Sequence, residues 1–219
     1  GHAGSGMHVH TRLVKDGKNM MVNNDGLSDT AKKLIAGFLQ LSESLTAFGN
    51  TVPTSFLRLV PHQEAPTSIC WGDRNRSVLV RVPLGWLGVD DMIKDANPQE
   101  KEDVEHLMNT QTVELRSPDG SANVHQLLAG MTVAALYGLE EEKALEYANS
   151  HYISQDATKC EGLRQLPASC CEAADALLKD REIYERNGVF PPGMIDKLAN
   201  DLKAHNDKDM SEKLFGNAD

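Results

Sequence analysis

Residues 28–50 carry the pattern that most limits how this chain folds. Large apolar side chains recur there at the three- and four-residue spacing of one helix face, which predicts an amphipathic helix. Ser28 is placed to cap its start and Gly49-Asn50 to end it. A helix of this kind has to bury its apolar face, so we expect it to pack on a sheet. The apolar positions are Leu34, Ile35, Phe38, Leu41 and Leu45.

Short β-prone runs supply the candidate strands of that sheet. Asp16-Gly17-Lys18-Asn19 is a turn sequence that predicts a hairpin with a return strand at 20–22. Pro53, Pro61 and Pro66 divide the segment after the long helix into extended and looping pieces. The other strands are expected at 7–14, 68–71, 77–82 and 112–117.

Helical patterns dominate the later part of the chain. A strongly apolar helix is expected at 122–137, and Ser169 with Glu172 forms a capping box ahead of the next one. Pro191-Pro192 precedes a last amphipathic helix that runs to about residue 205. Strands early and helices late predict an α+β fold, with an antiparallel sheet that carries helices on one side.

The same patterns predict one domain over residues 1–205. Residues 83–110 are polar and form an insertion-like excursion from the sheet, in which Asn97-Pro98 begins a short helix. Residues 206–219 are expected to be a polar tail that frays. The chain opens on a glycine loop that runs straight into a strand, whereas domains usually begin in a polar linker. We therefore expect a fragment of a longer protein.

Composition and charge argue against several classes of function. The chain has 219 residues and a net charge of -10, which disfavours nucleic-acid binding because phosphates need a basic surface. Its longest apolar stretch, 127–139, is shorter than the ~20 residues that span a bilayer, so no membrane role is expected. The 4 cysteines suit reduced thiols, and without an export signal we expect a cytoplasmic protein.

His8-Val9-His10 is the first candidate site. On a strand, alternation places both imidazoles on one face and sends Val9 towards the core. Two nitrogen bases on one surface can bind a metal ion or a phosphate, although the same pattern also occurs on plain polar strand faces. Gly4 and Gly6 would let the backbone approach a ligand closely, or simply make a turn.

Four arginines stand close together in a sequence that is otherwise acidic. Guanidinium groups hold carboxylates and phosphates through paired hydrogen bonds, so this set suits ATP or an amino-acid carboxylate. Ordinary surface ion pairs are the alternative. Glu64, between Pro61 and Pro66, lies in a segment that can cover a site or face solvent. The arginines are Arg58, Arg74, Arg76 and Arg81.

Glu114-Leu115-Arg116 is the third candidate and repeats the alternation of the histidine pair. A carboxylate and a guanidinium then share one strand face, where the first can bind a hard cation and the second a substrate carboxylate. A cross-strand ion pair would explain the same two residues. The later histidines, His125, His151 and His205, have no partner at a metal-ligand spacing and are expected to be structural or surface residues.

Taken together and in order, several segments form one specific signature. They are Gly4-Ser5-Gly6-Met7-His8-Val9-His10, Arg58-Leu59-Val60-Pro61 with Glu64-Ala65-Pro66, Arg74-Asn75-Arg76-Ser77 with Arg81-Val82-Pro83, Glu114-Leu115-Arg116-Ser117-Pro118-Asp119 with Ser121-Ala122-Asn123, and Leu166-Pro167-Ala168-Ser169. This series resembles the motifs of type I glutamine synthetases, over residues 4 to about 181. The resemblance implies the C-terminal portion of their catalytic domain.

That resemblance implies an ATP-dependent ligase that joins ammonia to the γ-carboxylate of glutamate through γ-glutamyl phosphate. His8 and Glu114 would ligate Mg or Mn. His10, Arg76 and Arg81 would contact the ATP phosphates, and Arg76 would also act on the transferring group.

The resemblance also implies how the amino acid is held. Gly4, Arg58 and Arg116 would bind glutamate, with the two arginines as carboxylate clamps that align it with the γ-phosphate. Glu64 would be a lid carboxylate that excludes water from the acyl phosphate and takes a proton as ammonia adds. The partners expected are therefore glutamate, ammonium and ATP.

Some residues depart from the family pattern. Thr112 stands where type I enzymes usually carry a further arginine, and Ala3 stands where many carry asparagine. The family's other metal carboxylates and its β-grasp domain are not in this sequence. We therefore expect an incomplete site, no synthetase activity of this chain alone, and a parent that forms a ring-shaped homo-oligomer.

Three other functions stay open at this point. The first is a γ-glutamyl ligase that uses an organic amine in place of ammonia. The second is a non-catalytic protein that resembles glutamine synthetase, and the intact set of candidate residues argues against it. The third, from a different class, is a His-x-His metal hydrolase, for which the sequence offers no further ligands.

Overall fold

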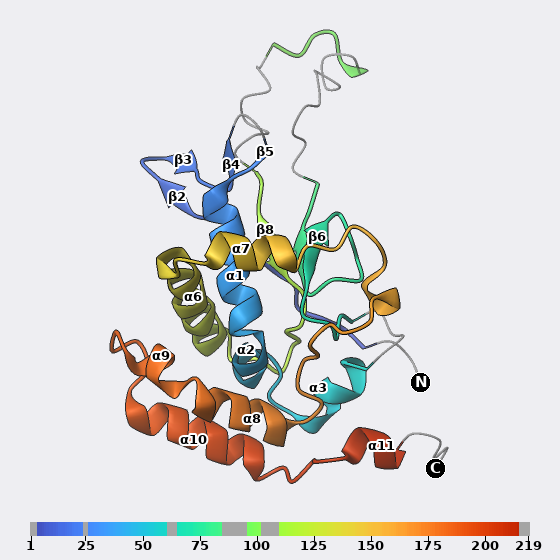
Figure 1. Ribbon diagram of the computed structural model, residues 1–219, viewed down its shortest axis with the longest axis vertical. Helices are drawn as coiled ribbons and strands as arrows, with labels where there is room; N and C mark the ends of the chain where they lie inside the picture. Colours follow the sequence, from blue (N-terminus) through green and yellow to red (C-terminus); the bar gives the residue numbers. More distant parts are fainter. Residues whose placement is uncertain (1–3, 24–25, 61–64, 85–95, 102–109, 215–219) are drawn as a thin grey trace.

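The computed structural model describes residues 4–23, 26–60, 65–84, 96–101 and 110–214 (Figure 1). Its main sheet has the strand order β1-β8-β7-β6, and two small hairpins pair β2 with β3 and β4 with β5. The strands are β1 (Val9–Thr11), β2 (Val14–Lys15), β3 (Lys18–Asn19), β4 (Val22–Asn23), β5 (Gly26–Leu27), β6 (Trp71–Asp73), β7 (Val80–Val82) and β8 (Val113–Leu115). The strands expected at 7–14, 77–82 and 112–117 are present in shorter form, whereas β6 begins only at the last residue of the run expected at 68–71. The return strand expected at 20–22 is wrong, because the chain turns at Asp16-Gly17 and returns in β3 at Lys18–Asn19.

The sheet is mixed, which corrects the expectation of an antiparallel one. β8 pairs antiparallel with both β1 and β7, but β6 and β7 run parallel, with Trp71 opposite Val80. Parallel neighbours normally need a long crossover. Here the connection is only residues 74–79. Arg74 reverses the chain in a left-handed conformation with φ 53°, and the residues after it lead back so that β7 starts beside the start of β6.

Helices cover one face of this sheet, as an α+β fold requires (Figure 1). α1 contacts both β7 and β8, and α6 packs along α1. Among the described residues, none of the helices is both long and apolar enough to cross a bilayer. The helices are α1 (Asp29–Gln40), α2 (Ser42–Gly49), α3 (Pro53–Arg58), α6 (Val124–Glu140), α7 (Ala144–Ser150), the short 3-10 turn η1 (Ala157–Lys159), α8 (Cys170–Lys179), α9 (Arg181–Glu185), α10 (Pro192–Lys203) and α11 (Met210–Leu214).

The long helix expected at 28–50 is two helices. Ser28 caps its start as predicted, because its Oγ accepts a hydrogen bond from the Ala31 N–H at 3.1 Å. The chain then bends at Leu41, between α1 and α2. The hydroxyls of Ser42 and Ser44 donate to backbone carbonyls three residues earlier, at 2.8 and 3.0 Å. Such local bonds compete with the regular helix ladder and bend it.

α1 and α6 approach each other at two glycines. A methyl group added to Gly37 would lie 2.0 Å from the Ala134 carbonyl oxygen, and one added to Gly138 would lie 2.1 Å from the Lys33 carbonyl oxygen. Both contacts are with backbone, which cannot rotate away as a side chain can. The two glycines therefore permit a helix spacing that no larger residue allows.

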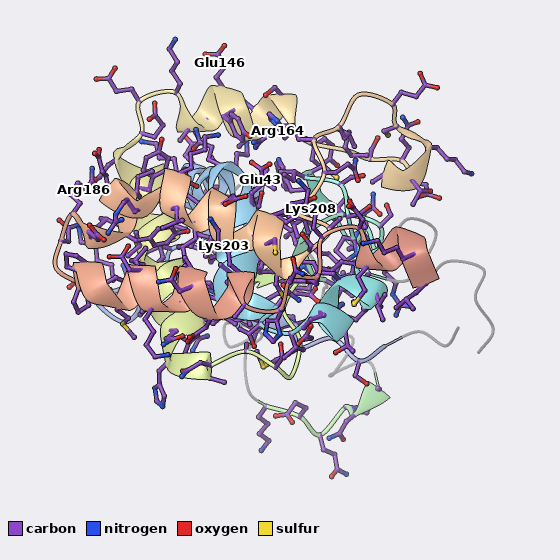
Figure 2. The ribbon with its side chains drawn as sticks, turned by 90° about the horizontal axis from the view of Figure 1, so that it is seen from below. Glu43, Glu146, Arg164, Arg186, Lys203 and Lys208 are labelled. Carbon is purple, nitrogen blue, oxygen red and sulfur yellow. The ribbon has the colours of Figure 1, made fainter. Side chains whose placement is uncertain are left out.

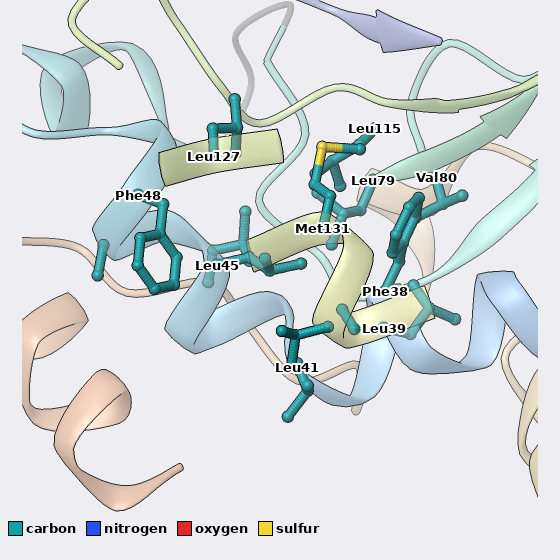
Figure 3. Close-up of a cluster of buried hydrophobic side chains, with 14 of the residues drawn as sticks. Phe38, Leu39, Leu41, Leu45, Phe48, Leu79, Val80, Leu115, Leu127 and Met131 are labelled. Atoms are coloured by element: carbon teal, nitrogen blue, oxygen red, sulfur yellow. The ribbon is translucent and has the colours of Figure 1, made fainter. Parts of the chain in front are cut away.

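The core lies between the sheet and these helices. Phe38 and Leu39 of α1 meet Leu79, Val80 and Leu115 of the sheet side (Figure 3). Leu45 and Phe48 extend the same cluster along α2 towards Leu127 and Met131 of α6 (Figure 3). Burial of this much apolar surface is the main favourable term in folding and holds the short strands in place.

Asp207 ties residues 206–214 to α8, which corrects the prediction of a fraying tail there, while residues 215–219 lie outside the described residues. Its carboxylate accepts hydrogen bonds from the N–H groups of Cys170 and Cys171 at the start of α8, at 2.8 and 3.2 Å. The Ser169–Glu172 cap predicted for the same helix is also present, with Glu172 N–H 3.1 Å from the Ser169 hydroxyl. The N-terminus of α8 is therefore capped by two residues far apart in sequence, Ser169 and Asp207.

The sequence patterns missed some elements and predicted others that the structure does not describe. α3 and α7 were not expected, since both are short and α3 begins in a proline-divided stretch. Most of the helix predicted from Asn97 to about residue 107 lies outside the described residues. The division of the chain at 83–110 stays a prediction for the same reason.

Replacing Gly37 by alanine tests the α1–α6 contact. We expect Gly37→Ala to lower the free energy of unfolding by about 3 kcal/mol, because backbone must move to admit the methyl group. Gly120→Ala is the control, since nothing lies within 4 Å of its added methyl group, and we expect it to change stability by less than about 0.5 kcal/mol. Urea denaturation would measure both, and equal effects would contradict the packing argument.

The Asp207 cap has a defined pH dependence. Burial alone would raise the pKa of Asp207, but the N–H bonds from Cys170 and Cys171 outweigh it and hold the pKa below its usual value. The stabilisation is therefore present above the unfolded pKa of about 3.9 and is lost as the pH falls below it. We expect Asp207→Ala to cost about 1–2 kcal/mol at neutral pH, and this deficit to shrink on acidification. Chemical denaturation from neutral to acidic pH would detect it, and a pH-independent deficit would contradict the ionised cap.

Candidate active site

Glu114 occupies the middle of the sheet. β8 lies between β1 and β7, and the register places Glu114 opposite His10 on one side and Arg81 on the other. Alternation along β8 sends Val113 and Leu115 into the core below the helices. The Glu114 carboxylate therefore lies on the face of the sheet opposite to the helical layer, and it is only 1% exposed.

Basic side chains surround the Glu114 carboxylate. His8 Nδ1 is 2.9 Å from Oε1, and Arg81 Nε is 2.5 Å from Oε2. Arg116 Nε and His10 Nε2 are 3.8 and 4.0 Å from Oε1. As predicted, His8 and His10 therefore lie on one face of the sheet. Glu114 and Arg116 also share that face.

The Glu114 oxygens still lack proper hydrogen bonds. Among the described residues neither oxygen accepts a hydrogen bond of regular geometry, although both are in close ion pairs, Oε1 with His8 at 2.9 Å and Oε2 with Arg81 at 2.5 Å. A buried carboxylate with open lone pairs is costly unless something else binds it. A hard divalent cation, which takes oxygen ligands, fits this requirement.

His8 is suited to join Glu114 at such a cation. Burial of its ring lowers the pKa of His8, and the charge of Arg116 lowers it further, while Glu114 acts in the opposite direction. A neutral imidazole is the form that ligates metals. Within the described part of the chain no three His, Cys, Asp or Glu side chains are grouped for a metal ion, so this chain offers two such ligands here. Mg²⁺ is commonly held by few protein groups and several waters, which fits this partial set.

A pocket of about 670 Å³ opens beside this cluster. Its walls carry the guanidinium groups of Arg76, Arg81 and Arg116, so it suits an anionic ligand such as a polyphosphate. Asp156 and Thr158, which lie far along the sequence, also line it. The full lining is His8, Ala65, Pro66, Thr67, Ser68, Arg76, Ser77, Arg81, Arg116, Asp156 and Thr158.

Gly4 and Arg58 lie against each other, as the shared role predicted for them requires. A methyl group on Gly4 would sit 3.1 Å from the Arg58 side chain, so the glycine makes room for it. Arg58 donates to the carbonyl oxygens of Ser117 and Pro118. Its Nε, like that of Arg116, is buried without an acceptor among the described residues.

The remaining predicted residues are placed differently. His10 bonds through Nδ1 to the Thr112 hydroxyl at 2.9 Å and does not line the pocket. Arg74 forms the turn after β6 and is also absent from the pocket wall. Glu64 lies outside the described residues, although Ala65 and Pro66, which follow it, line the pocket.

Asp156 and Thr158 were not predicted as site residues. They line the pocket because Ser77 Oγ accepts a hydrogen bond from the Ala157 N–H at 2.8 Å, which fixes this turn next to the Arg76 wall. Asp156 also caps η1 through the Thr158 N–H at 3.1 Å. The Asp-x-Thr spacing is a local turn signal, but nothing in it indicates which site the turn faces.

Comparison with known proteins identifies the family. The family described as "Glutamine synthetase, catalytic domain" matches residues 1–213. The glutamine synthetase of Thermococcus kodakarensis is 36% identical over 199 residues, which cover 90% of this chain and 40% of that protein. That of Methylococcus capsulatus is 34% identical over 208 residues, covering 93% and 39%. The chain thus spans about 40% of the length of these curated relatives.

Solved structures agree on the fold. The structure of Plasmodium falciparum glutamine synthetase has a TM-score of 0.66 at 22% identity, and the match covers 99% of this chain and 46% of that one. A GmaS/ADP complex has a TM-score of 0.65 at 22% identity, covering 95% and 44%. At this identity the likeness concerns the fold, while the family rests on the sequence match. This chain belongs to the glutamine synthetase family and corresponds to part of its catalytic domain.

Proposed function

We propose that this chain supplies part of the active site of a ligase that forms glutamine from glutamate, ammonium and ATP. One observation carries the proposal. A buried Glu114 carboxylate with open lone pairs lies beside His8 and at the edge of an arginine-lined pocket. This arrangement combines a place for a divalent cation with a place for phosphate, which is what phosphoryl transfer to a carboxylate needs.

The residues take distinct parts in this proposal. His8 and Glu114 would hold Mg or Mn, which when bound neutralises phosphate charge. Arg76 and Arg81 bind the phosphates from the pocket wall, and His10, on β1 opposite Glu114, contacts them from outside that wall. Because the guanidinium donors are already placed, the charge that develops during transfer is met without reorganisation.

The amino acid is held on the other side of the arginine cluster. Arg58 and Arg116 clamp its carboxylates through their guanidinium groups, and Gly4 lets the substrate approach the backbone. Glu64 covers the γ-glutamyl phosphate, excludes water and accepts a proton from the incoming ammonium. We also propose that the longer parent works in the cytoplasm as a ring-shaped homo-oligomer.

The metal site can be tested on this chain directly. We expect the chain to bind Mn²⁺ weakly, and Glu114→Gln to weaken binding at least tenfold, because the amide keeps the shape of the carboxylate but not its charge. Glu172→Gln, at a helix cap away from the pocket, is the matched control. Electron paramagnetic resonance of free Mn²⁺ gives the affinities, and equal affinity of wild type and Glu114→Gln would refute the site.

Activity requires the longer protein. Because the described residues offer two candidate metal ligands, we expect this chain alone to release no phosphate from ATP with glutamate and ammonium. In a parent that contains it, Arg58→Ala should raise the KM for glutamate. Glu64→Ala should lower kcat by about 10²-fold or more while ATP still binds.

The same assay separates the alternatives. Turnover with methylamine but not with ammonium would assign the parent to the organic-amine ligases. ATP binding without turnover in the intact parent would assign it to the non-catalytic proteins. Glutamine formation by the isolated chain would contradict the proposal that its site is partial.

A further inference from the structure

Asn75, in the connection between β6 and β7, forms four hydrogen bonds with its side chain. Its Nδ2 donates to the carbonyl oxygens of Ile153 and Gln155, at 3.3 and 2.7 Å. Its Oδ1 accepts from the N–H and the hydroxyl of Ser77, at 2.9 and 2.7 Å. With the amide turned the other way, Oδ1 would face two carbonyl oxygens, so these bonds also fix its orientation. They use both donor hydrogens and both lone pairs of the amide, and Asn75 is not part of the pocket lining.

Ser77 continues this network to the segment that lines the pocket. Its Oγ donates to Asn75 Oδ1 and accepts from the Ala157 N–H at 2.8 Å. The side chains of Asn75 and Ser77, here called the amide network, therefore bind that segment at two carbonyl oxygens and one N–H group. Asp156 and Thr158, on either side of Ala157, line the arginine-lined pocket. The amide network thus bonds directly to one wall of the pocket.

Other contacts fix the two ends of this segment, residues 151–164. Its start is bonded to β6, where the His151 carbonyl oxygen accepts from the Trp71 N–H at 3.1 Å. At its end Arg164 pairs with Glu43 of α2 at 3.0 Å, and the two side chains lie close together in Figure 2. Between these ends the segment is mostly exposed, and the amide network and one buried alanine hold it against the strands.

The amide network also holds two arginines of the pocket. Arg76 lies between its two members in the sequence and lines the pocket. Arg116 Nη1 donates to the carbonyl oxygens of Arg76 and Val78, the second at 3.3 Å. A shift of this stretch of backbone therefore moves Arg76 and removes an acceptor from Arg116. The network joins these guanidinium groups to the wall that carries Asp156 and Thr158.

We propose that Asn75 is a positioning residue, which sets Arg76 for phosphate binding by tying the β6–β7 connection to the wall that carries Asp156 and Thr158. This rests on the proposed function, in which Arg76 binds phosphate, and explains how that side chain is held. Aspartate at this position would set two acceptors against carbonyl oxygens, and alanine would make none of the four bonds. Gly72 permits the close approach, because a methyl group added there would lie 2.4 Å from the Ile153 carbonyl oxygen.

Binding of inorganic tripolyphosphate to the purified chain, measured by titration calorimetry without divalent cations, tests this role. We expect Asn75→Ala to weaken binding about tenfold, although it removes neither a charge nor a side chain of the pocket lining. Asn200→Ala, at an exposed asparagine of α10, is the matched control and should bind as wild type does. Equal affinity of Asn75→Ala and wild type would overturn the proposal.

A double-mutant cycle separates positioning from a general loss of structure. In wild type we expect Arg76→Ala to weaken tripolyphosphate binding about tenfold. In the Asn75→Ala background the same change should weaken it less than about threefold, because Arg76 is already displaced. Two effects that simply multiply would contradict a role through Arg76. Asn75→Ser, a neutral change that keeps one donor, should give the same pattern and replaces Asn75→Ala if that variant does not fold.

Hydrogen exchange on peptides covering 153–160 gives a second readout that needs no ligand. We expect Asn75→Ala to speed amide exchange there about tenfold or more, and Asn200→Ala to leave it unchanged. Peptides from α1 should exchange as in wild type in both variants. Unchanged exchange at 153–160 would overturn the positioning role alone. Failure of wild type to bind tripolyphosphate would instead overturn the phosphate role of Arg76, and with it the part of Asn75 in binding.

Discussion

The close crossing of α1 and α6 at Gly37 and Gly138 is the constraint on which the rest of the structure depends. It brings two backbones together where any added methyl group would overlap a carbonyl oxygen. At this spacing Phe38 and Leu39 reach the strands, and the sheet is covered on one face. Three-residue strands have few hydrogen bonds of their own, so the helical layer holds them in register.

The face of the sheet opposite to the helices carries the charges of the candidate site. Glu114 is buried among two histidines and two arginines, and no described residue gives either of its oxygens a hydrogen bond of regular geometry. Burying such a cluster costs desolvation that its internal attraction only partly offsets. The strands on both sides of β8 hold these groups in place despite that cost. Such a cost is typical of a binding site, where a bound ligand completes the interactions that the protein leaves unmade.

Long-range contacts assemble the arginine-lined pocket. Ser77 holds the turn at Ala157, and Trp71 and Ile69 hold the two ends of the segment that surrounds it. Asp207 fixes α8 from a position 36 residues after Cys171. These hydrogen bonds join segments that are far apart in the sequence.

Local patterns in the sequence determined much of this protein, because capping, helical periodicity and strand alternation act between neighbours. They predicted the cap at Ser28 and the shared faces of His8 with His10 and of Glu114 with Arg116. The tertiary structure decided the rest. The parallel pairing of β6 with β7, the bend at Leu41, the order imposed by Asp207 and the place of Asp156 in the pocket depend on contacts between distant segments. Such contacts leave no periodic trace in the sequence, since each rests on a few bonds rather than on a repeated spacing.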